Sequence, residues 1–273
     1  MAYETILVER DAGRATVTLN RPEKLNAMTG ETFVELHDAF REFADEDLDV
    51  VTIRGAGDHF SAGVDMAGVP EWAQQKPIAV RDNLEVVHDA LRTIEGLDVP
   101  IVAAIDGYAL GGGLELTLAC DIRVASHRSK FGLPEANMGL AMDLGGAQKL
   151  PGMIGEGMTK WLIMTGKNID AQRAFDVGLV EQVAAEGEFD AMVADLEDTL
   201  AEKPTYVLGI AKRQVHSARP SNLDEAMNQA IHHALTAYQE DETQRRVTEF
   251  LDRRAPAQTF RAPPSTARGR RPG

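Results

Sequence analysis

The pattern that most limits the fold of this chain is an alternation of short apolar stretches with helix-like stretches through its first 150 residues. The apolar stretches have the length of strands, and two of them run directly into a glycine-containing segment. Strands that alternate with helices are typical of an α/β core in which most strands are parallel. The chain is therefore predicted to begin with a core of this class.

The predicted elements follow from residue periodicity. Strands are expected at 4–9, 14–19, 50–54, 100–105 and 122–125. A helix is expected at 31–44 because Phe33, Leu36, Phe40 and Phe43 recur at helical spacing on one face. Further helices are expected at 79–95, over the apolar stretch before Cys120, and then at 156–165, 170–177, 188–202, 204–217 and 222–253. A helical C-terminal region is therefore predicted to follow the core.

Composition narrows the class of protein and its partners. Apolar residues make up 44% and charged residues 26% of the 273 residues, which allows a large core. The net charge is −15, and residues 1–252 alone carry −21 because residues 253–273 hold six arginines and no acid. Such a body repels nucleic acid and anionic membranes, and no apolar run is long enough to span a bilayer. The Pro- and Arg-rich tail, 255–273, is expected to be disordered.

Several kinds of site are excluded by their missing motifs. A dinucleotide-binding turn would need a third glycine where Phe60 follows Gly55-Ala56-Gly57, and no Walker loop, HExxH or G-x-S-x-G is present. The adjacent His232 and His233 would point to different faces of a helix, so no metal site is predicted. Cys120 is the only cysteine and no leader sequence is apparent, so a reducing, cytoplasmic location is expected.

Two segments after predicted strands could bring backbone N–H groups to a ligand. The first is FSAGVD at 60–65, and the second is GYALGGGLEL at 107–116. Small residues let a ligand approach the backbone closely, and a glycine run that opens a helix exposes N–H groups and the positive end of the helix dipole. This arrangement suits an anion or a developing oxyanion. An ordinary turn and a flexible hinge are the alternative interpretations.

Three carboxylates near these glycines are candidate functional groups. Glu115 falls in an apolar helix, where an acid is uncommon unless it is paired. Glu135 is expected on an extended loop because Pro134 precedes it, and a surface carboxylate is its simpler interpretation. Asp143 precedes a helix that it could cap, or it could face a ligand.

Six segments in fixed order resemble the crotonase (enoyl-CoA hydratase/isomerase) superfamily. They are NRPEKLNAM (20–28), FSAGVD (60–65), GYALGGGLEL (107–116), ACDIRVAS (119–126), FGLPE (131–135) and DAQRAFDVGLVEQV (170–183). The resemblance covers about residues 3–250. It implies a spiral ββα core at 1–200, a helical C-terminal trimerisation region at 201–254, and homotrimers that often pair into hexamers. It also implies an enzyme that acts on acyl-CoA thioesters and needs no cofactor, since CoA is part of the substrate.

The resemblance also assigns roles to individual residues. The N–H groups of Val64 and Gly112 would stabilise an enolate-like thioester oxygen. Glu115 and Glu135 lie 20 positions apart, as in enoyl-CoA hydratases, and would handle the water and the proton. The segments that would flank CoA comprise Lys24, Leu25, Asn26, Ala62, Val64, Asp65, Met66, Ala67 and Gly112. Hydration of a 2-enoyl-CoA to a 3-hydroxyacyl-CoA is the predicted reaction.

One departure from the hydratase pattern keeps two other functions open. Many hydratases read Ile-Pro-Gly-Ala-Gly-Gly where this chain reads AMDLGG at 141–146. The segment resembles dienoyl-CoA isomerases, although they typically have Asp where this chain has Glu115. The first alternative is therefore a dienoyl-CoA or enoyl-CoA isomerase that uses Asp143 as an additional acid. The other alternative is a non-catalytic homologue that binds RNA or a partner protein. The arginine-rich tail favours RNA binding and the acidic body opposes it.

Overall fold

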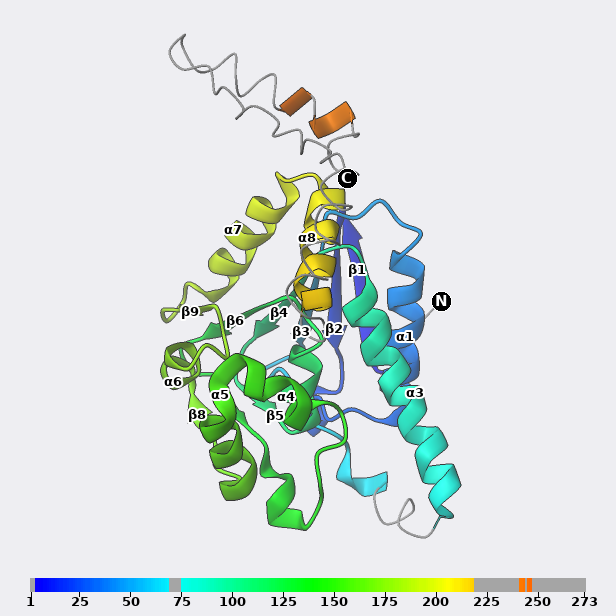
Figure 1. Ribbon diagram of the computed structural model, residues 1–273, viewed down its shortest axis with the longest axis vertical. Coiled ribbons are helices and arrows are strands. Elements are labelled where there is room, and N and C mark those ends of the chain that lie inside the picture. The colour runs from blue at the N-terminus through cyan, green and yellow to red at the C-terminus, as the bar shows by residue number, and fades with distance from the viewer. Residues whose placement is uncertain (1–2, 69–74, 219–240, 244, 247–273) are drawn as a thin grey trace, which may run out of the picture. The chain divides into compact units, whose positions relative to one another are not determined.

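The computed structural model describes residues 3–68, 75–218, 241–243 and 245–246 (Figure 1). The chain divides into two compact units, 1–226 and 227–273. In the second unit the five described residues are helical, and Glu242 pairs with Arg245 and Arg246. The predicted tail, His232-His233 and most of the predicted helix 222–253 lie outside the described residues. The domain boundaries at 200 and 254 therefore stay a prediction.

A six-stranded sheet forms the centre of the first unit, in the order β1-β2-β3-β4-β6-β9. Its strands are β1 (Ile6–Asp11), β2 (Arg14–Leu19), β3 (Val50–Gly55), β4 (Ile101–Ile105), β6 (Ile122–Ser126) and β9 (Gln182–Ala184). The β1–β2 pair is an antiparallel hairpin that turns at Ala12 and Gly13, both with positive φ, and the other pairs are parallel. The predicted α/β core with largely parallel strands is confirmed.

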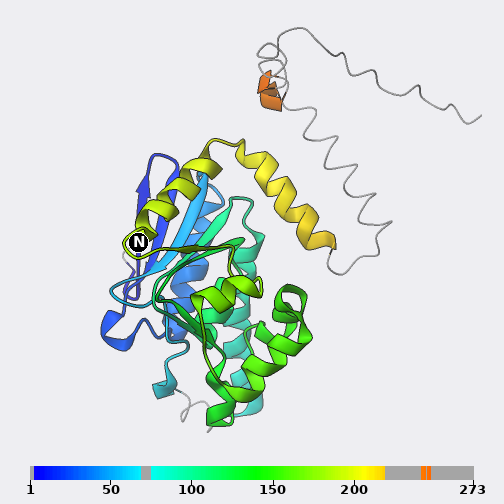
Figure 2. The same ribbon diagram turned by 90° about the vertical axis from the view of Figure 1, so that its left-hand side faces the viewer.

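Both faces of the sheet are covered, which explains the continuous apolar runs of its central strands. Along β4, Ile101, Ala103 and Ile105 join the main core, whereas Val102 and Ala104 join a second cluster. Helices α1 (Gly30–Phe43) and α3 (Pro77–Gly96) pack side by side on the main-core face. Helix α7 (Phe189–Ala201) covers the opposite face and lies in front of the sheet in Figure 2.

Three short strands form a second sheet in the order β5-β7-β8, which the sequence did not predict. They are β5 (Tyr108–Leu110), β7 (Lys130–Gly132) and β8 (Ile169–Asp170). Strands of two or three residues, β9 included, are too short to show a period-2 pattern. They nevertheless place the glycine run after β5 beside the segment after β7.

The remaining helical elements are the 3-10 turns η1 (Pro22–Lys24), η2 (Met66–Gly68) and η3 (Pro134–Met138), and the helices α4 (Gly112–Thr117), α5 (Gly146–Thr165), α6 (Ala171–Asp176) and α8 (Thr205–Ala218). Among them, α4, α6 and α8 lie where the sequence predicted them, and the three 3-10 turns were not predicted. The predicted start of a helix at 156 was wrong, since α5 begins at Gly146 and continues through Pro151 with a kink at Gly155. The extended loop predicted for Glu135 was also wrong, because Glu135 lies in η3. Pro134 starts that turn, where its missing N–H costs nothing.

Buried polar contacts fix the end of α4. The Arg123 guanidinium donates to the carbonyl oxygens of Cys120 and Leu179, at 3.1 and 2.9 Å, and pairs with Glu181 at 2.6 Å. Cys120 is only 6% exposed, and burial raises the pKa of its thiol to about 12. Asp121 accepts from the Ile101 N–H at 2.8 Å and pairs with Lys212 of α8 at 2.9 Å. Helix α4 is thus held at its C-terminal end.

Within the described residues, no helix has the length and apolar character needed to cross a membrane.

Candidate active site

Helix α4 carries Glu115 into the protein interior. The helix begins after Gly111, whose φ is +52°, and all six of its residues are buried. Glu115 is 2% exposed, and its Oε1 accepts a hydrogen bond from the Gly146 N–H at 2.7 Å. A Cβ on Gly146 would lie 2.9 Å from that Oε1, so glycine is needed for this approach. The predicted buried carboxylate is therefore confirmed, and it is held by the first N–H of α5.

Two backbone N–H groups, of Val64 and Gly112, converge near Glu115. Met28 donates to the Gly63 carbonyl oxygen and accepts from the Asp65 N–H, both at 2.8 Å, so the Val64 N–H points away from Met28. Gly112 is the first residue of α4, so its N–H has no acceptor within the helix. A Cβ on Gly112 would lie 3.5 Å from the Val64 nitrogen and 2.9 Å from its Cγ2. The two predicted donors therefore lie close together beside a space that only glycine leaves open.

Glu135 and Asp143 lie near the same space. A Cβ on Gly111 would lie 2.8 Å from Glu135 Oε1. Glu135 Oε2 is buried and has no hydrogen-bond partner among the described residues, which is costly unless a ligand or water supplies one. Asp143 does not cap α5, because the N-cap residue is Gly145 and no side chain caps the helix. The capping interpretation of Asp143 was therefore wrong.

Burial raises the pKa values of all three carboxyl groups, and neighbouring carboxylates raise those of Glu115 and Glu135 further. Burial raises the pKa of Glu115 to about 7, helped by the charges of Glu135 and Asp143 and opposed by the Gly146 N–H. Loss of water around Glu135 raises its pKa, and Asp143 adds to this. Asp143 is exposed at the mouth of the site, but neighbouring protein atoms displace enough water to raise its pKa, against a lowering by His88. Not all three carboxylates need be ionised at neutral pH.

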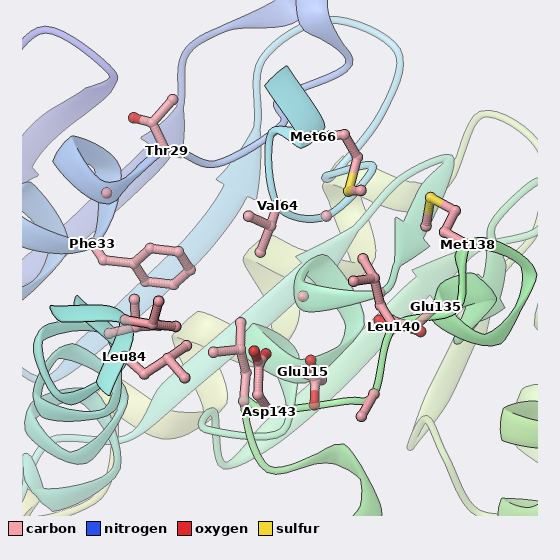
Figure 3. Close-up of a pocket in the computed structure, with 18 of the residues that line it drawn as sticks. Thr29, Phe33, Val64, Met66, Leu84, Glu115, Glu135, Met138, Leu140 and Asp143 are labelled. Carbon is pink, nitrogen blue, oxygen red and sulfur yellow. The ribbon is translucent and has the colours of Figure 1, made fainter. Parts of the chain in front are cut away.

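These groups surround a pocket of about 510 Å³. Figure 3 shows Phe33 and Leu84 on one side of it, Met138 and Leu140 on the other, and the carboxylates of Glu115 and Asp143 between them. The pocket is lined by Thr29, Gly30, Phe33, Ala62, Gly63, Val64, Met66, Gln75, Pro77, Val80, Leu84, Val87, Gly111, Gly112, Glu115, Pro134, Glu135, Met138, Leu140, Ala141, Asp143 and Leu144. Its walls are thus mainly apolar, with the acids and free N–H groups at one place.

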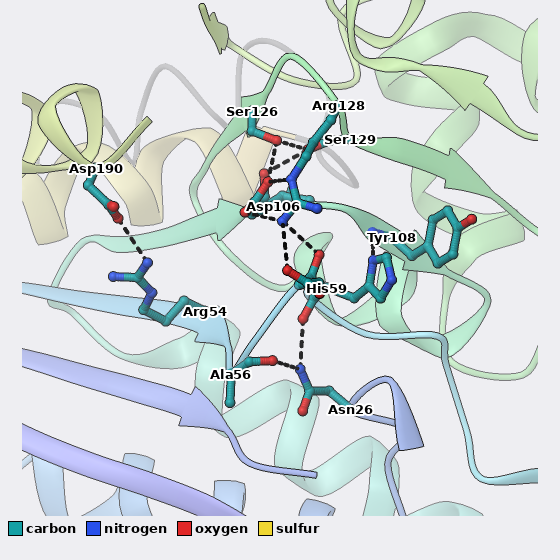
Figure 4. Close-up of polar contacts among 12 residues, drawn as sticks. Asn26, Arg54, Ala56, His59, Asp106, Tyr108, Ser126, Arg128, Ser129 and Asp190 are labelled. Atoms are coloured by element: carbon teal, nitrogen blue, oxygen red, sulfur yellow. Dashed lines mark hydrogen bonds and ion pairs between the residues drawn. The ribbon is translucent and has the colours of Figure 1, made fainter. Parts of the chain in front are cut away.

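Five of the residues predicted to flank CoA do not line this pocket: Lys24, Leu25, Asn26, Asp65 and Ala67. Asn26 is buried, and its amide donates to the carbonyl oxygens of Ala56 and His59 at 2.8 and 2.7 Å (Figure 4). Asp65 pairs with Arg21 at 2.9 Å and accepts from the Ala67 N–H at 3.0 Å. Lys24 and Leu25 are exposed. These side chains therefore shape or border the loops beside the pocket.

A polar network supports β5, which leads into the glycine run. Arg128 pairs with Asp106 at 2.6 Å (Figure 4). It also donates to the Asp58 carbonyl oxygen at 2.9 Å. The ring of His59 stacks on Tyr108 with centroids 4.3 Å apart, and His59 Nδ1 accepts from the Tyr108 N–H at 3.2 Å. The segment from Asp106 to Tyr108 is thus tied to the loop that follows β3.

Among residues 3–68, 75–218 and the short helical pieces beyond, no cluster of His, Cys, Asp or Glu is arranged to hold a metal.

The sequence did not predict the apolar walls or His88. Phe33, Val80, Leu84 and Val87 come from α1 and α3, whose buried faces look like ordinary core faces in the sequence. His88 Nε2 lies 2.6 Å from the Asp143 carbonyl oxygen, across 55 residues of sequence. No local motif indicates such a contact.

The chain is similar in sequence and in structure to known enoyl-CoA hydratases. Residues 9–260 match the family model described as enoyl-CoA hydratase/isomerase. "Crotonyl-CoA hydratase" of Syntrophomonas wolfei is 32% identical over 93% of this chain and 97% of that protein. "Short-chain-enoyl-CoA hydratase" of Clostridium acetobutylicum is 32% identical over 83% of this chain and 87% of that protein. The crystal structure of enoyl-CoA hydratase from Bacillus anthracis superposes with a TM-score of 0.85 at 29% identity, over 93% of this chain and 98% of that one.

Proposed function

The chain belongs to the enoyl-CoA hydratase/isomerase family, and from this premise we propose that it catalyses the reversible hydration of a 2-enoyl-CoA thioester to a 3-hydroxyacyl-CoA. The observation that carries the proposal is that Glu115 and Glu135 line one pocket with Val64 and Gly112. A carboxylate pair beside two free N–H groups supplies what hydration of a thioester needs. CoA is part of the substrate, so the reaction needs no further cofactor.

The proposed reaction places the thioester carbonyl oxygen between the N–H groups of Val64 and Gly112. Water adds its oxygen to C3 of the enoyl group, and negative charge develops on the thioester oxygen as an enolate. A fixed backbone donor of this kind contributes roughly 10²–10³ in rate. The enolate then takes a proton at C2, so that the product has gained one hydroxyl group and one hydrogen.

Glu115 and Glu135 supply the proton transfers. One carboxylate accepts a proton from the attacking water, and the other group, when protonated, delivers one to C2. General acid–base help of this kind is worth about 10²–10⁴ in rate. Because burial raises the pKa of Glu115 to about 7, both of its protonation states are populated at neutral pH. This is the condition under which a carboxyl group serves well as acid and as base.

The apolar walls suit the acyl chain, and exposed basic groups suit the nucleotide end of CoA. Phe33, Leu84 and Leu140 present hydrocarbon to the pocket. Lys24 is exposed in the turn before Leu25, where φ is +52°. The net charge of −15 repels the CoA phosphates, but exposed charges farther away than about 8 Å are largely screened at physiological salt, so a cation close to the phosphates can outweigh it.

We also propose a homotrimer, alone or paired into a hexamer. The support is the family membership and the exposure of three large apolar side chains on α5 and α6, namely Trp161, Met164 and Phe175. Sedimentation at micromolar concentration is expected to give three or six times the 29.7 kDa chain mass. A species of one chain mass would contradict the proposal. A cytoplasmic location stays a prediction.

Isomerisation of a dienoyl-CoA is a second candidate reaction, favoured by the position of Asp143. Its side chain lines the pocket with Glu115 and caps no helix, so it is free to meet a substrate. Steady-state assays of crotonyl-CoA and of a 3,5-dienoyl-CoA, run side by side, test both reactions. Hydration of crotonyl-CoA that is lost in Glu115→Gln supports the main proposal. Turnover of the dienoyl ester without hydration of crotonyl-CoA would replace it by isomerisation.

A further inference from the structure

The loop between η3 and α5, residues 139–145, carries Asp143 past the mouth of the pocket. It begins at Gly139 and ends at Gly145, both with positive φ, 71° and 103°. The Leu140 N–H donates to the Glu135 carbonyl oxygen at 3.0 Å. Within the described residues, however, residues 141–144 make no backbone–backbone hydrogen bond to another element. The position of this segment is therefore set by side-chain contacts: Leu144 is buried in the main core, and side chains of neighbouring elements contact the segment's backbone.

Two side chains hold the segment from opposite sides. On the inner side, Glu115 accepts from the Gly146 N–H at 2.7 Å, and the Leu144 N–H also points toward its carboxylate. On the outer side, His88 Nε2 meets the Asp143 carbonyl oxygen at 2.6 Å. A carbonyl oxygen can only accept, so Nε2 carries the hydrogen in this contact. The segment is thus held between α4 and α3.

Helix α3 is a firm support for the outer contact. The residue before His88, Val87, is 3% exposed, lines the pocket and joins the main core, and Ala90 is buried in the same core. The helix also packs along α1. His88 therefore extends from a packed helix to residues 141–144, which make no backbone–backbone hydrogen bond to another described element.

We propose that His88 is a positioning residue for the active site. By donating its Nε2–H to the Asp143 carbonyl oxygen, it holds residues 141–144 so that the Asp143 side chain and the N–H groups at the start of α5 stay aligned with Glu115. His88 touches no reacting atom and acts through this segment. The catalytic consequence rests on the proposed function, whereas the effect on the segment does not.

The charge of His88 is a second influence that an experiment has to separate from the hydrogen bond. A protonated His88 lowers the pKa of the Asp143 carboxyl group. The charged groups around it are Asp89 and Arg92 on its own helix, which pair at 2.6 Å, and His37 of α1, which acts on Asp89. His88→Gln keeps an N–H donor and removes the charge, whereas His88→Ala removes both.

Hydrogen exchange of the free protein tests the hold on the segment without reference to activity. His88→Ala should speed exchange of the amides in a peptide spanning 139–146, on the order of tenfold for one lost hydrogen bond, while a peptide spanning β4 stays unchanged. His88→Gln should stay near wild type. His37→Ala is the matched control, because His37 contacts the exposed Asp38 on α1. Unchanged exchange of 139–146 in His88→Ala overturns the proposal.

Turnover kinetics test the catalytic consequence. For hydration of crotonyl-CoA, His88→Ala should lower kcat on the order of tenfold with little change in KM, and His88→Gln should restore most of it. The effect of His88→Ala should persist in an Asp143→Asn background, because it acts through the backbone carbonyl. Two outcomes would overturn the hydrogen-bond proposal and assign the role of His88 to its charge. One is that His88→Ala has no effect in the Asp143→Asn background, and the other is that His88→Gln is as impaired as His88→Ala. If the wild type does not hydrate crotonyl-CoA, the proposed function is refuted. The positioning role of His88 is then decided by the hydrogen-exchange result.

Discussion

Replacing Glu115 by glutamine should stabilise the protein at alkaline pH while it removes activity. Burial raises the pKa of Glu115 from 4.5 to about 7. One pKa unit corresponds to about 1.4 kcal/mol, so the ionised form of this side chain costs the folded state about 3 kcal/mol. Glutamine does not ionise, and its carbonyl oxygen can still accept from the Gly146 N–H.

The sign of the pH dependence follows from the proton bound in each state. Below about pH 4.5 the carboxyl group is protonated in both folded and unfolded chains, and no cost arises. Between pH 4.5 and about 7 the folded state keeps a proton that the unfolded state has released, so wild-type stability falls as pH rises. Above about pH 7 the full cost is present. The stability advantage of Glu115→Gln should therefore grow by about 3 kcal/mol between about pH 4 and pH 8.

Urea unfolding of both proteins at several pH values is the measurement. Glu35→Gln is a matched control, because Glu35 is another buried glutamate whose carboxylate accepts from the N–H groups of Glu4 and Thr5. In Glu35→Gln one of these N–H donors would face the amide NH₂, which cannot accept a hydrogen bond. The free energy of unfolding of this variant should therefore fall by about 1–3 kcal/mol. A stability difference between Glu115→Gln and wild type that does not change with pH would refute the reasoning. Turnover of Glu115→Gln should fall by about 10²–10⁴.

Three further substitutions test the other assignments. Glu135→Gln should lower kcat by about 10²–10⁴ with a melting temperature no lower than that of the wild type, because burial raises the pKa of Glu135 as well, and near-wild-type turnover on the true substrate would remove Glu135 from the mechanism. Lys24→Glu should raise KM for the CoA ester more than it lowers kcat, because a phosphate contact is made equally in the ground and transition states; the reverse pattern in steady-state kinetics would contradict it. Asp143→Asn should retain hydration of crotonyl-CoA and abolish any isomerisation of a 3,5-dienoyl-CoA, and loss of hydration would make Asp143 part of the main reaction.

The parts of the fold that could be predicted from the sequence are those with enough residues to show a period. The strand at 14–19 was placed correctly because its alternating pattern runs through six residues, and the helix containing Phe33 and Phe40 because its apolar face recurs over several turns. The strand at 108–110 has three residues and no pattern to detect. Helix α5 was predicted to start too late because Pro151 and Gly155 interrupt its sequence, although the backbone continues through both.

The same contrast applies to the site. Glu115 and Gly112 could be found because they occur in one short segment whose chemistry is visible locally. Leu84 and His88 could not, because their roles depend on where α3 lies relative to the loop around Asp143. The capping interpretation of Asp143 failed for a local reason: the helix starts three residues later, and Gly145, with φ of +103°, takes the N-cap position.

The buried Cys120 gives this protein a built-in chemical reporter of local opening. Thiol reagents attack the thiolate, and with a pKa of about 12 only about one folded molecule in 10⁴ carries it at pH 8. In an opened chain the thiol regains an ordinary pKa near 8.5, so labelling proceeds mainly from open molecules. Since the chain has a single cysteine, every labelling event reports the same junction between α4 and β6. A substrate analogue that binds beside Glu115 would slow the labelling, so occupancy of the site can be followed as a reaction half-time without any turnover.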